Sequence, residues 1–412
     1  MNKRISLGVA ISLIAIGCAI TFVLTWTVSL NIYNSKISSA DKYEGVYEKL
    51  REIDAVVKNN YIDINSISEE AIENGIINGY VSGIGDKYAS YLEANNYYEL
   101  QQNSGGVVSG AGLVAQPDGS GYLVVTKVYT NSSAHLNGIK VGDVITEIDG
   151  KSLLTMEEKT ALEKISGEIG TKLTMKLLRD SEEINVSLIR QQIDIESVTG
   201  EMLDNGIGYI KITSFNDKTA EQFSGALNSL TSSTLNALIL DVRQNGGGSI
   251  APLKSMLNKL LPACVAATAE YANGVRKTLI ETDSATNINV PMAILVDGGT
   301  ASAAELFAVA LRDEGNALLI GTQTYGKAVI QGTFGFPDGT ALTISNAKII
   351  PSKSASYDGV GLKPDYVTEL PAGTSPDTVS RENDSQLQKA VEILTPAAPA
   401  TPETPDDAET NE

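Results

Sequence analysis

Residues 296–306 read VDGGTASAAEL, and this stretch indicates the fold class of the second half of the chain. It follows an apolar run at 292–296 that has the length of a buried strand. It then leads into a helical pattern at 302–311. A strand that passes through a tight turn of small residues into a helix is the repeating unit of α/β sheets. The stretch therefore predicts an α/β arrangement around it.

The same alternation of strand and helix extends to both sides of this stretch. Further strands are expected at 207–212, 238–242 and 317–320, and further helices at 218–230, 250–261 and 384–394. Strands that alternate with helices of this length form a partly parallel sheet with covered faces. The sequence predicts an α/β core, a mixed sheet with helices, over residues 193–394.

Residues 105–192 show a different pattern, in which short segments of alternating apolar and polar residues are separated by turns. Strands are expected at 113–115, 122–128, 144–148, 173–178 and 184–188, with one helix at 156–165. Thr155 could cap that helix, because Glu158 three residues later would complete a capping box. This pattern predicts a small β-rich module inserted ahead of the α/β core.

The N-terminal part is predicted to contain an anchor and a helical region. Lys3 and Arg4 precede 26 uncharged residues at 5–30, more than the roughly 20 that a spanning helix needs. By the positive-inside rule, residues 1–38 form a cytoplasmic N-terminus and a single transmembrane anchor, which places the catalytic region outside the cytoplasm, at the cell surface or in the periplasm. Region 39–104 is helical, at 39–61 and 69–81, with a loop at 86–92.

Charge and composition exclude several classes of protein. The net charge of −19 argues against nucleic-acid binding, which needs a basic surface. One histidine and two cysteines provide neither a common zinc site nor a disulfide framework, so no metal or cofactor is expected. Hydrolytic chemistry would depend on Ser, Thr, Lys, Asp or Glu. The acidic, proline-rich tail at 395–412 is predicted to be disordered.

Ser302 is the first candidate for a chemical role. It stands at the start of a predicted helix, where small neighbours leave its hydroxyl approachable and free N–H groups can stabilise an anion. Ser302 and Glu305 also match a capping box, in which the serine would only cap the helix. The residues alone leave both interpretations open.

Lys327 is the second candidate, in the segment GKAVIQ at 326–331. A free lysine has a pKa of about 10.4 and is a poor base at neutral pH, but burial among apolar neighbours lowers that pKa. Gln331, four residues later, could orient the amine. The alternative is a lysine on an edge strand whose stem lies on apolar surface.

The segment LDVRQNGGG at 240–248 is the third candidate. Three glycines after a buried strand allow the backbone N–H groups to point outward, as an oxyanion hole requires. A phosphate-binding loop is excluded because the pattern GxxxxGK[ST] is absent. A plain tight turn is the alternative.

A fourth candidate lies in the β-rich module, ahead of its first strand. Backbone amides of a glycine-containing loop beside an open sheet edge can bind a peptide's C-terminal carboxylate. The residues concerned are Ser109, Gly110, Ala111, Gly112 and Leu113.

Taken in order, these motifs resemble a known family. The string GIKVGDVITEIDG at 138–150 resembles a PDZ domain. Segments 86–92, 208–215, 241–248, 300–305, 326–331, 359–365 and 386–390 resemble the C-terminal processing peptidases, also called tail-specific proteases, over about residues 40–394. The chain departs from the family pattern at Asp297, where Asn is common, and at 165–167, 328–330 and 351–356.

The resemblance implies a role for each candidate. Ser302 would be the nucleophile, Lys327 the general base and Gln331 the group that holds the lysine. The amide of Ala303 and one from Gly246 or Gly247 would form the oxyanion hole, and Ser109–Leu113 the carboxylate-binding loop.

The implied function is an endopeptidase that cleaves proteins or peptides selected by their free C-termini. The N-terminal helices could also pair two copies of the chain. A different class of protein is a catalytically idle PDZ scaffold that tethers partners at the membrane. A hydrolase of small esters is disfavoured because GxSxG is absent.

Overall fold

The computed structural model describes residues 7–283 and 287–395, in two units. The first ends at Gly79 and the second begins at Tyr80, and each is described by itself. Lys3 and Arg4, which orient the predicted anchor, and residues 396–412 of the predicted disordered tail lie outside the described residues.

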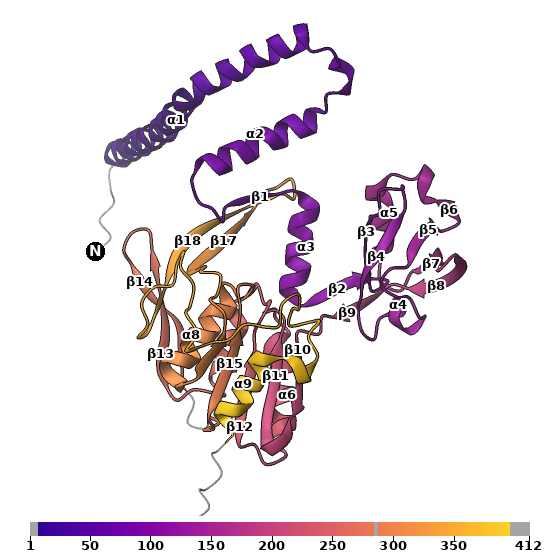
Figure 1. Cartoon of the computed structure of the whole chain (residues 1–412). Coiled ribbons are helices and arrows are strands. Elements are labelled where there is room, and N and C mark those ends of the chain that lie inside the picture. The colour runs from indigo at the N-terminus through magenta and orange to yellow at the C-terminus, as the bar shows by residue number, and fades with distance from the viewer. Residues whose placement is uncertain (1–6, 284–286, 396–412) are drawn as a thin grey trace, which may run out of the picture. The chain divides into compact units, whose positions relative to one another are not determined.

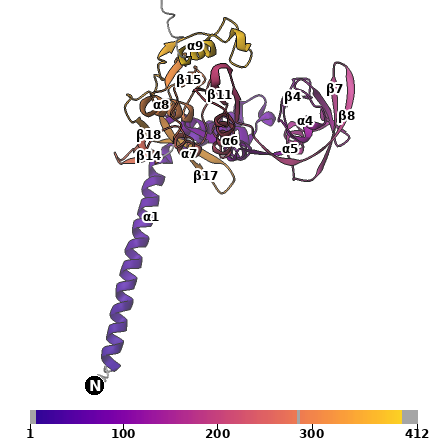
Figure 2. The same cartoon turned by 90° about the horizontal axis from the view of Figure 1, so that it is seen from below.

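The first unit is helical. Helix α1 (Leu7–Asn60) is one uninterrupted helix (Figure 2), so the predicted helix at 39–61 continues the apolar stretch instead of standing apart from it. A short turn (Ile64–Ser66) leads to α2 (Glu69–Gly83), close to its predicted bounds. Among the described residues, no helix combines the length and apolar character needed to cross a membrane. The side chains of residues 7, 9–16, 18–19 and 30–42 of α1 are not among those described.

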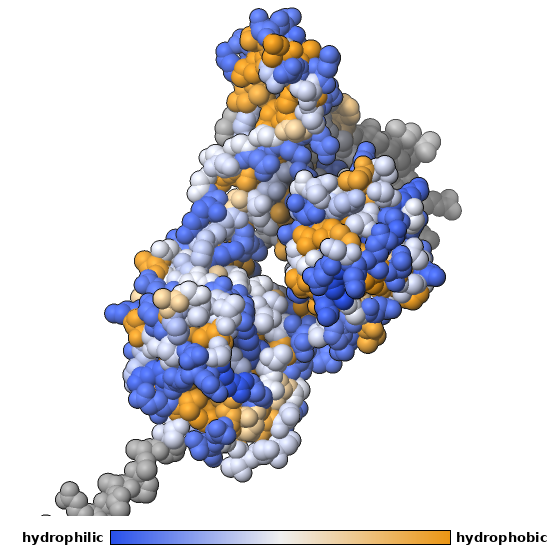
Figure 3. All heavy atoms as spheres, turned by 45° about the vertical axis from the view of Figure 1, so that its right-hand side comes forward, coloured by the Kyte–Doolittle hydropathy of each residue, from blue (hydrophilic) through white to orange (hydrophobic). Residues whose placement is uncertain are grey.

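Large apolar side chains lie on the surface of this helical unit (Figure 3). They include Val46, Ile53 and Val56 on α1, and Ile72 and Ile76 on α2, all exposed. An amphipathic helix normally buries its apolar face against another element. The single chain does not bury these side chains.

The second unit is built around a six-stranded sheet in the order β10-β11-β12-β15-β16-β19. Figure 1 labels four of these strands, β10, β11, β12 and β15. The strands are β10 (Val198–Met202), β11 (Ile207–Ile212), β12 (Ala237–Asp241), β15 (Met292–Val296), β16 (Leu318–Gly321) and β19 (Tyr366–Val367). β10 is antiparallel to its neighbour and the others are parallel. The mixed α/β sheet predicted from the sequence is confirmed.

Helices cover both faces of this sheet. Alternate strand residues divide between two apolar clusters, with Leu238 and Leu240 in one and Ile239 in the other. The first cluster includes α6 (Thr219–Thr231), α7 (Ala251–Leu257) and α8 (Ala303–Gly315), and the second includes α9 (Ser385–Leu394). Strands buried on both faces have continuous apolar runs, which is why the sequence located them well.

A second sheet joins strands that are far apart in the sequence. Its order is β1-β18-β13-β14, and β17 also pairs with β18. The strands are β1 (Ser90–Leu92), β13 (Cys264–Tyr271), β14 (Arg276–Thr282), β17 (Val329–Gly335) and β18 (Ala341–Pro351).

The prediction that 86–92 is a loop was wrong for its last three residues, because Ser90 pairs with Thr343. Three residues are too short to show a strand period, so the distant partner defines this strand. Helix α3 (Ala94–Gly105), which follows β1, was not predicted.

The β-rich module contains the five predicted strands: β3 (Leu113–Pro117), β4 (Leu123–Val128), β5 (Val144–Ile148), β7 (Lys172–Arg179) and β8 (Glu182–Ile189), with β6 (Lys151–Ser152) beside β5. Its helices are α4 (Ser133–Leu136) and α5 (Glu158–Ile165). The chain enters and leaves through β2 (Val107–Gly110) paired with β9 (Gln191–Asp194).

The predicted cap at Thr155 was wrong. Glu157 occupies the N-cap of α5, while the Thr155 hydroxyl donates to the Ser152 carbonyl at 2.9 Å within a short turn.

Candidate active site

Three adjacent strands bring the candidate residues to one edge of the core sheet. β12, β15 and β16 are parallel neighbours, with Asp241 opposite Leu295 and Val296 opposite Gly321. Parallel strands that lie side by side end at the same edge, where α/β proteins form their sites. The glycine loop follows β12, the Ser302 turn follows β15 and the Lys327 segment follows β16.

Ser302 stands at the N-cap of α8 and is half-buried. Its backbone has φ 56° and ψ −116°, a conformation that non-glycine residues rarely adopt. An ordinary N-cap residue lies in the β region, so helix capping alone does not require this strain. Strained residues of this kind cluster at functional sites.

The Ala303 amide and the glycine loop meet beside Ser302. Ala303 is the first residue of α8, where the N–H has no acceptor within the helix. A Cβ on Gly247, whose φ is 99°, would lie 2.9 Å from Ser302 Cβ and 3.0 Å from Ala303 N. The Gly247 N–H donates to Asn245 Oδ1 at 2.9 Å. It would have to exchange that bond before it could bind an oxyanion, whereas Gly246, one residue earlier in the same turn, is exposed.

Lys327 is held by the residue predicted to hold it. Gln331, on β17, accepts a hydrogen bond from Lys327 Nζ through Oε1, and its Nε2 donates to the Tyr88 carbonyl at 2.7 Å. Burial lowers the pKa of the Lys327 ammonium from its ordinary value, and the nearby Asp86 carboxylate partly opposes that change. A half-buried, hydrogen-bonded amine differs from the solvated head expected of a surface lysine.

Glu305 joins the two segments. Its bond to the Ser302 amide is the capping-box contact that the sequence predicted, whereas its bonds to Gly326 and Lys327 were not predicted. Its side chain is fully buried. Oε2 accepts from Ser302 N at 2.9 Å and from Lys327 N at 2.8 Å, while Oε1 accepts from Gly326 N at 2.7 Å. A lone acid within the apolar helix segment AAELFAVAL was the available signal, because a buried carboxylate needs several donors.

Asp297, one of the departures from the family pattern, joins the glycine loop to the Ser302 turn. Its Oδ1 accepts from Gln244 N at 2.9 Å and from Gly299 N at 3.0 Å. Its Oδ2 accepts from Gln244 Nε2 at 2.6 Å. The Asp297 carboxylate therefore holds together two loops that follow different strands.

A buried ion network fixes the beginning of the glycine loop. Arg243 Nε donates to Asp241 Oδ1 at 2.9 Å, and Nη2 donates to Asp384 Oδ2 at 2.9 Å. Burial alone would lower the pKa of the Arg243 guanidinium, but the two carboxylates outweigh it and raise that pKa. Asp384 caps α9, which covers the face of the sheet opposite to α8. The network therefore links the glycine loop to that second face.

Groups suited to metal binding are not assembled here. Within residues 7–283 and 287–395, no three His, Cys, Asp or Glu side chains are placed to hold a metal ion. The site offers a hydroxyl, an amine, an amide and backbone N–H groups. These are the parts needed for nucleophilic attack on a carbonyl group and for stabilisation of the resulting oxyanion.

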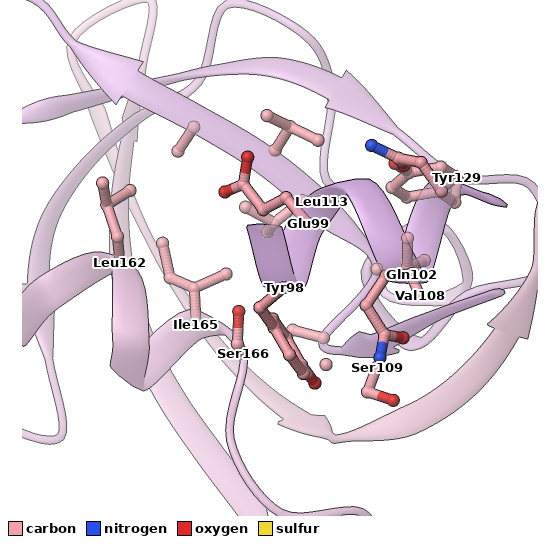
Figure 4. Close-up of a pocket in the computed structure, with 16 residues that line it drawn as sticks. Tyr98, Glu99, Gln102, Val108, Ser109, Leu113, Tyr129, Leu162, Ile165 and Ser166 are labelled. Atoms are coloured by element: carbon pink, nitrogen blue, oxygen red, sulfur yellow. The ribbon is translucent and has the colours of Figure 1, made fainter. Parts of the chain in front are cut away.

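A separate cavity of 330 Å³ lies against the β-rich module (Figure 4). Leu113 on β3 and Leu162 and Ile165 on α5 contribute apolar walls. Tyr98 and Glu99 come from α3, which precedes the module in the sequence. A groove between a strand and a helix suits a peptide added as a further strand.

The predicted carboxylate-binding residues all line this cavity, although they do not form one loop. Ser109 and Gly110 belong to β2 and pair with Gln192 and Gln191. The Ala111 amide donates to the Ile165 carbonyl at 3.2 Å. Gly112 and Leu113 form the end of the turn, and Gly112 has φ 90°.

Comparisons with known proteins agree with this division. Residues 206–368 match the family model of peptidase family S41, and residues 124–179 match that of the PDZ domain. The chain is 30% identical over 335 residues to carboxy-terminal processing protease CtpA of Bacillus subtilis, covering 81% of this chain and 71% of that protein.

Two further similarities extend the comparison. The chain is 31% identical over 301 residues to the chloroplastic carboxyl-terminal-processing peptidase 2 of Arabidopsis thaliana, covering 69% of this chain and 58% of that protein. The solved photosystem II D1 C-terminal processing protease is 25% identical, with a TM-score of 0.47 over 83% of this chain and 92% of that one.

Proposed function

This chain belongs to peptidase family S41 and is a serine-type C-terminal processing endopeptidase with a PDZ domain, and we propose that Ser302 is its nucleophile and Lys327 its general base. The observation that carries the proposal is the meeting of a strained Ser302 and a half-buried Lys327 through the single carboxylate of Glu305. Retention of Ser302, Lys327 and Gln331 together disfavours an idle scaffold.

The proposed reaction begins with proton transfer. Neutral Lys327 takes the proton of the Ser302 hydroxyl while Oγ bonds to the carbonyl carbon of the scissile peptide. The negative charge moves to the carbonyl oxygen, where the Ala303 amide and an amide of the Gly246–Gly247 turn stabilise it. Protonated Lys327 then gives its proton to the departing amine as the C–N bond breaks, which leaves an acyl group on Ser302.

Water completes the cycle. Lys327, neutral again, accepts a proton from the water that attacks the acyl carbon. It then returns that proton to Ser302 Oγ as the Oγ–carbon bond breaks, which restores the hydroxyl and the neutral amine and releases a carboxylic acid that ionises in water. In the described part of the chain, Lys327 Nζ bonds Gln331 and not Ser302. The proposal therefore requires the lysine to turn toward the hydroxyl when substrate binds, since catalytic hydrogen bonds tighten in the enzyme–substrate complex.

The proposed substrates are proteins or peptides with a free, apolar C-terminus. Leu113, Leu162 and Ile165 provide an apolar pocket for the last side chain, and the amides around Gly112 can receive its carboxylate. The tail would lie in the PDZ groove while an upstream peptide bond reaches Ser302.

Membrane attachment is a further part of the proposal. The uncharged stretch at 5–30 is longer than a bilayer requires, and Lys3 and Arg4 favour a cytoplasmic N-terminus. An alkaline phosphatase reporter, active only outside the cytoplasm, should be active when fused to the C-terminus. It should lose that activity when residues 5–30 are removed. An inactive full-length fusion would contradict an extracytoplasmic catalytic region.

Self-association through the N-terminal helices is proposed from their exposed apolar side chains, such as Ile53, Ile72 and Ile76. Light scattering of the detergent-solubilised chain should give more than one protomer per particle. Ile72→Asp together with Ile76→Asp should reduce this to one. A wild-type protein that is monomeric at all concentrations would contradict it.

Labelling tests the proposed nucleophile and base together. A serine-directed phosphonate should modify Ser302 in the full-length enzyme, as mapped by mass spectrometry of proteolytic fragments. Lys327→Met should abolish the labelling while the thermal unfolding temperature stays close to that of wild type, because the serine then has no base. Labelling at another serine, or at an unchanged rate in Lys327→Met, would contradict the Ser–Lys pair.

A further inference from the structure

The segment that follows α2 contacts the lysine side of the site. The Tyr88 carbonyl accepts from Gln331 Nε2 at 2.7 Å, and the Tyr88 hydroxyl donates to the Gly326 carbonyl at 3.1 Å. Lys327 Nζ lies 5.0 Å from the centre of the Tyr88 ring. Tyr88 thus contacts the residue before the lysine, the lysine itself and the glutamine that holds it.

Asp86 fixes Tyr88 in this position. Its Oδ1 accepts from Tyr88 N at 3.0 Å and from Ser345 Oγ at 3.0 Å, and its Oδ2 accepts from Ser345 N at 2.7 Å. Ser345 lies opposite Gln331 in the β17–β18 ladder, at an irregularity in the register. The carboxylate therefore ties the segment to the strand position that faces Gln331.

We propose that Asp86 and Tyr88 are positioning residues that hold the Lys327–Gln331 pair, and that the negative charge of Asp86 stabilises the Lys327 ammonium. This inference rests on the proposed function, in which Lys327 is the base. It assigns a role to the N-terminal segment 86–92, which lies more than 200 residues before the nucleophile in the chain.

Other charged groups besides Asp86 lie around Lys327 and Tyr88. Glu305 on α8 bonds the Lys327 backbone N–H at 2.8 Å, Asp358 bonds the Ala328 N–H at 3.2 Å, and Lys87 lies 4.6 Å from the Tyr88 ring centre. Burial raises the pKa of Asp86, but hydrogen bonds from Ser345 and Tyr88 outweigh burial and hold that pKa below its ordinary value.

Asp86 is therefore ionised at neutral pH. An anion close to an ammonium favours its charged form, and Asp86 accordingly raises the pKa of Lys327 while burial lowers it. Removing the anion should lower that pKa further.

A titration that does not depend on activity provides the first test. In full-length protein carrying Ser302→Ala and ¹³Cε-labelled lysine, the Lys327 resonance is assigned by its loss in Lys327→Met. Asp86→Asn, which keeps an acceptor oxygen but removes the charge, should move its titration midpoint to lower pH. Asp118→Asn is the matched control, because exposed Asp118 makes a similar turn with Ser120 in the β-rich module. An unchanged midpoint in Asp86→Asn would overturn the proposal.

Kinetics provide the second test. Asp86→Asn should shift the acidic limb of kcat/KM to lower pH and reduce the plateau kcat several-fold, with KM for a tail peptide unchanged. Asp86→Ala should lower kcat further, because it also removes the acceptor oxygen that holds Tyr88 and Ser345. The smaller loss of kcat in Asp86→Asn would show that the conservative substitution partly rescues the enzyme. A loss that is equal at every pH would mean that Asp86 only supports the fold and would contradict its role at Lys327.

The two hypotheses fail in different ways. If Lys327→Met kept full activity, the proposed function would be wrong whatever the midpoint showed. If Lys327→Met were inactive but the titration midpoint of Lys327 were unchanged in Asp86→Asn, the proposed function would stand and this inference would be wrong.

Discussion

The sheet edge around Ser302 and the groove of the PDZ domain differ in how each is constructed. The Ser302 site draws on three parallel strands and on residues as distant as Tyr88 and Gln331. The buried carboxylate of Glu305 joins its Ser302 and Lys327 segments. The groove is formed mainly within one short stretch of chain, by β3 and α5, with α3 beside it.

Under the proposed function, this difference separates reaction from recognition. Bond cleavage needs groups held to a fraction of an ångström, which a network across several strands provides. Tail binding needs an open strand edge and an apolar pocket, which a small local module provides. Substitutions at the sheet edge should therefore change turnover, and substitutions in the groove should change the choice of substrate.

The largest expected effect is on turnover alone. Ser302→Ala and Lys327→Ala should each lower kcat/KM for a casein-like substrate by at least about 10³-fold, since the two residues act as one unit. Binding of a fluorescent tail peptide, measured by anisotropy, should stay unchanged in both. Loss of peptide binding in either variant would show that the two regions are not separable, and substantial activity in Lys327→Ala would exclude it as the base.

The second effect compares two adjacent glycines. Gly247→Ala should lower kcat about 10²-fold, because its Cβ would crowd Ala301 O at 2.7 Å and Ser302 Cβ at 2.9 Å, and would disturb the turn proposed to stabilise the oxyanion. Gly246→Ala introduces the same methyl group where a Cβ meets nothing within 4 Å, and it should cost much less. Equal losses in the two variants would contradict the packing of Gly247 against the Ser302 turn.

The pH dependence of kcat/KM should arise from the sheet edge around Ser302 and not from the groove. Burial lowers the pKa of Lys327, and the base is active when neutral. kcat/KM should therefore rise by about tenfold per pH unit below that pKa and level off above it. The plateau should begin at a lower pH than it would for a free lysine. Peptide binding to the groove, followed by anisotropy over the same range, should lack this limb. A flat rate profile in folded enzyme would leave the lysine without a catalytic role.

The smallest effect concerns the groove. A peptide ending in a free carboxylate after a small apolar residue should be cut about tenfold faster than its amide, because a charge-assisted hydrogen bond stabilises the bound acid by about 1.5–3 kcal/mol. Gly112→Ala should remove the preference, since its Cβ would lie 2.1 Å from Ser132 Cβ. Gly119→Ala, also at positive φ but in open space, is the control. Equal cleavage of acid and amide by the wild type would mean that the groove does not select tails.

Local patterns were sufficient to predict much of this fold. The continuous apolar runs of β12 and β15, the recurring isoleucines of β11 and the alternation in the β-rich module are local side-chain patterns, which depend only on neighbouring residues. The helix beginning near Ser302 follows from the same kind of local pattern, and the ordered motifs indicated the family.

Tertiary pairing was needed for the remainder. β1 is a strand only because β18 lies beside it. The cap predicted at Thr155 is the exception, because it failed for a local reason: the short turn with Ser152 takes its hydroxyl. The strain at Ser302, the sharing of Glu305 between two segments and the contact of Tyr88 with Gln331 join residues that are distant in the chain. Periodicity and propensity carry no information about such contacts, because their geometry exists only once the sheets have formed.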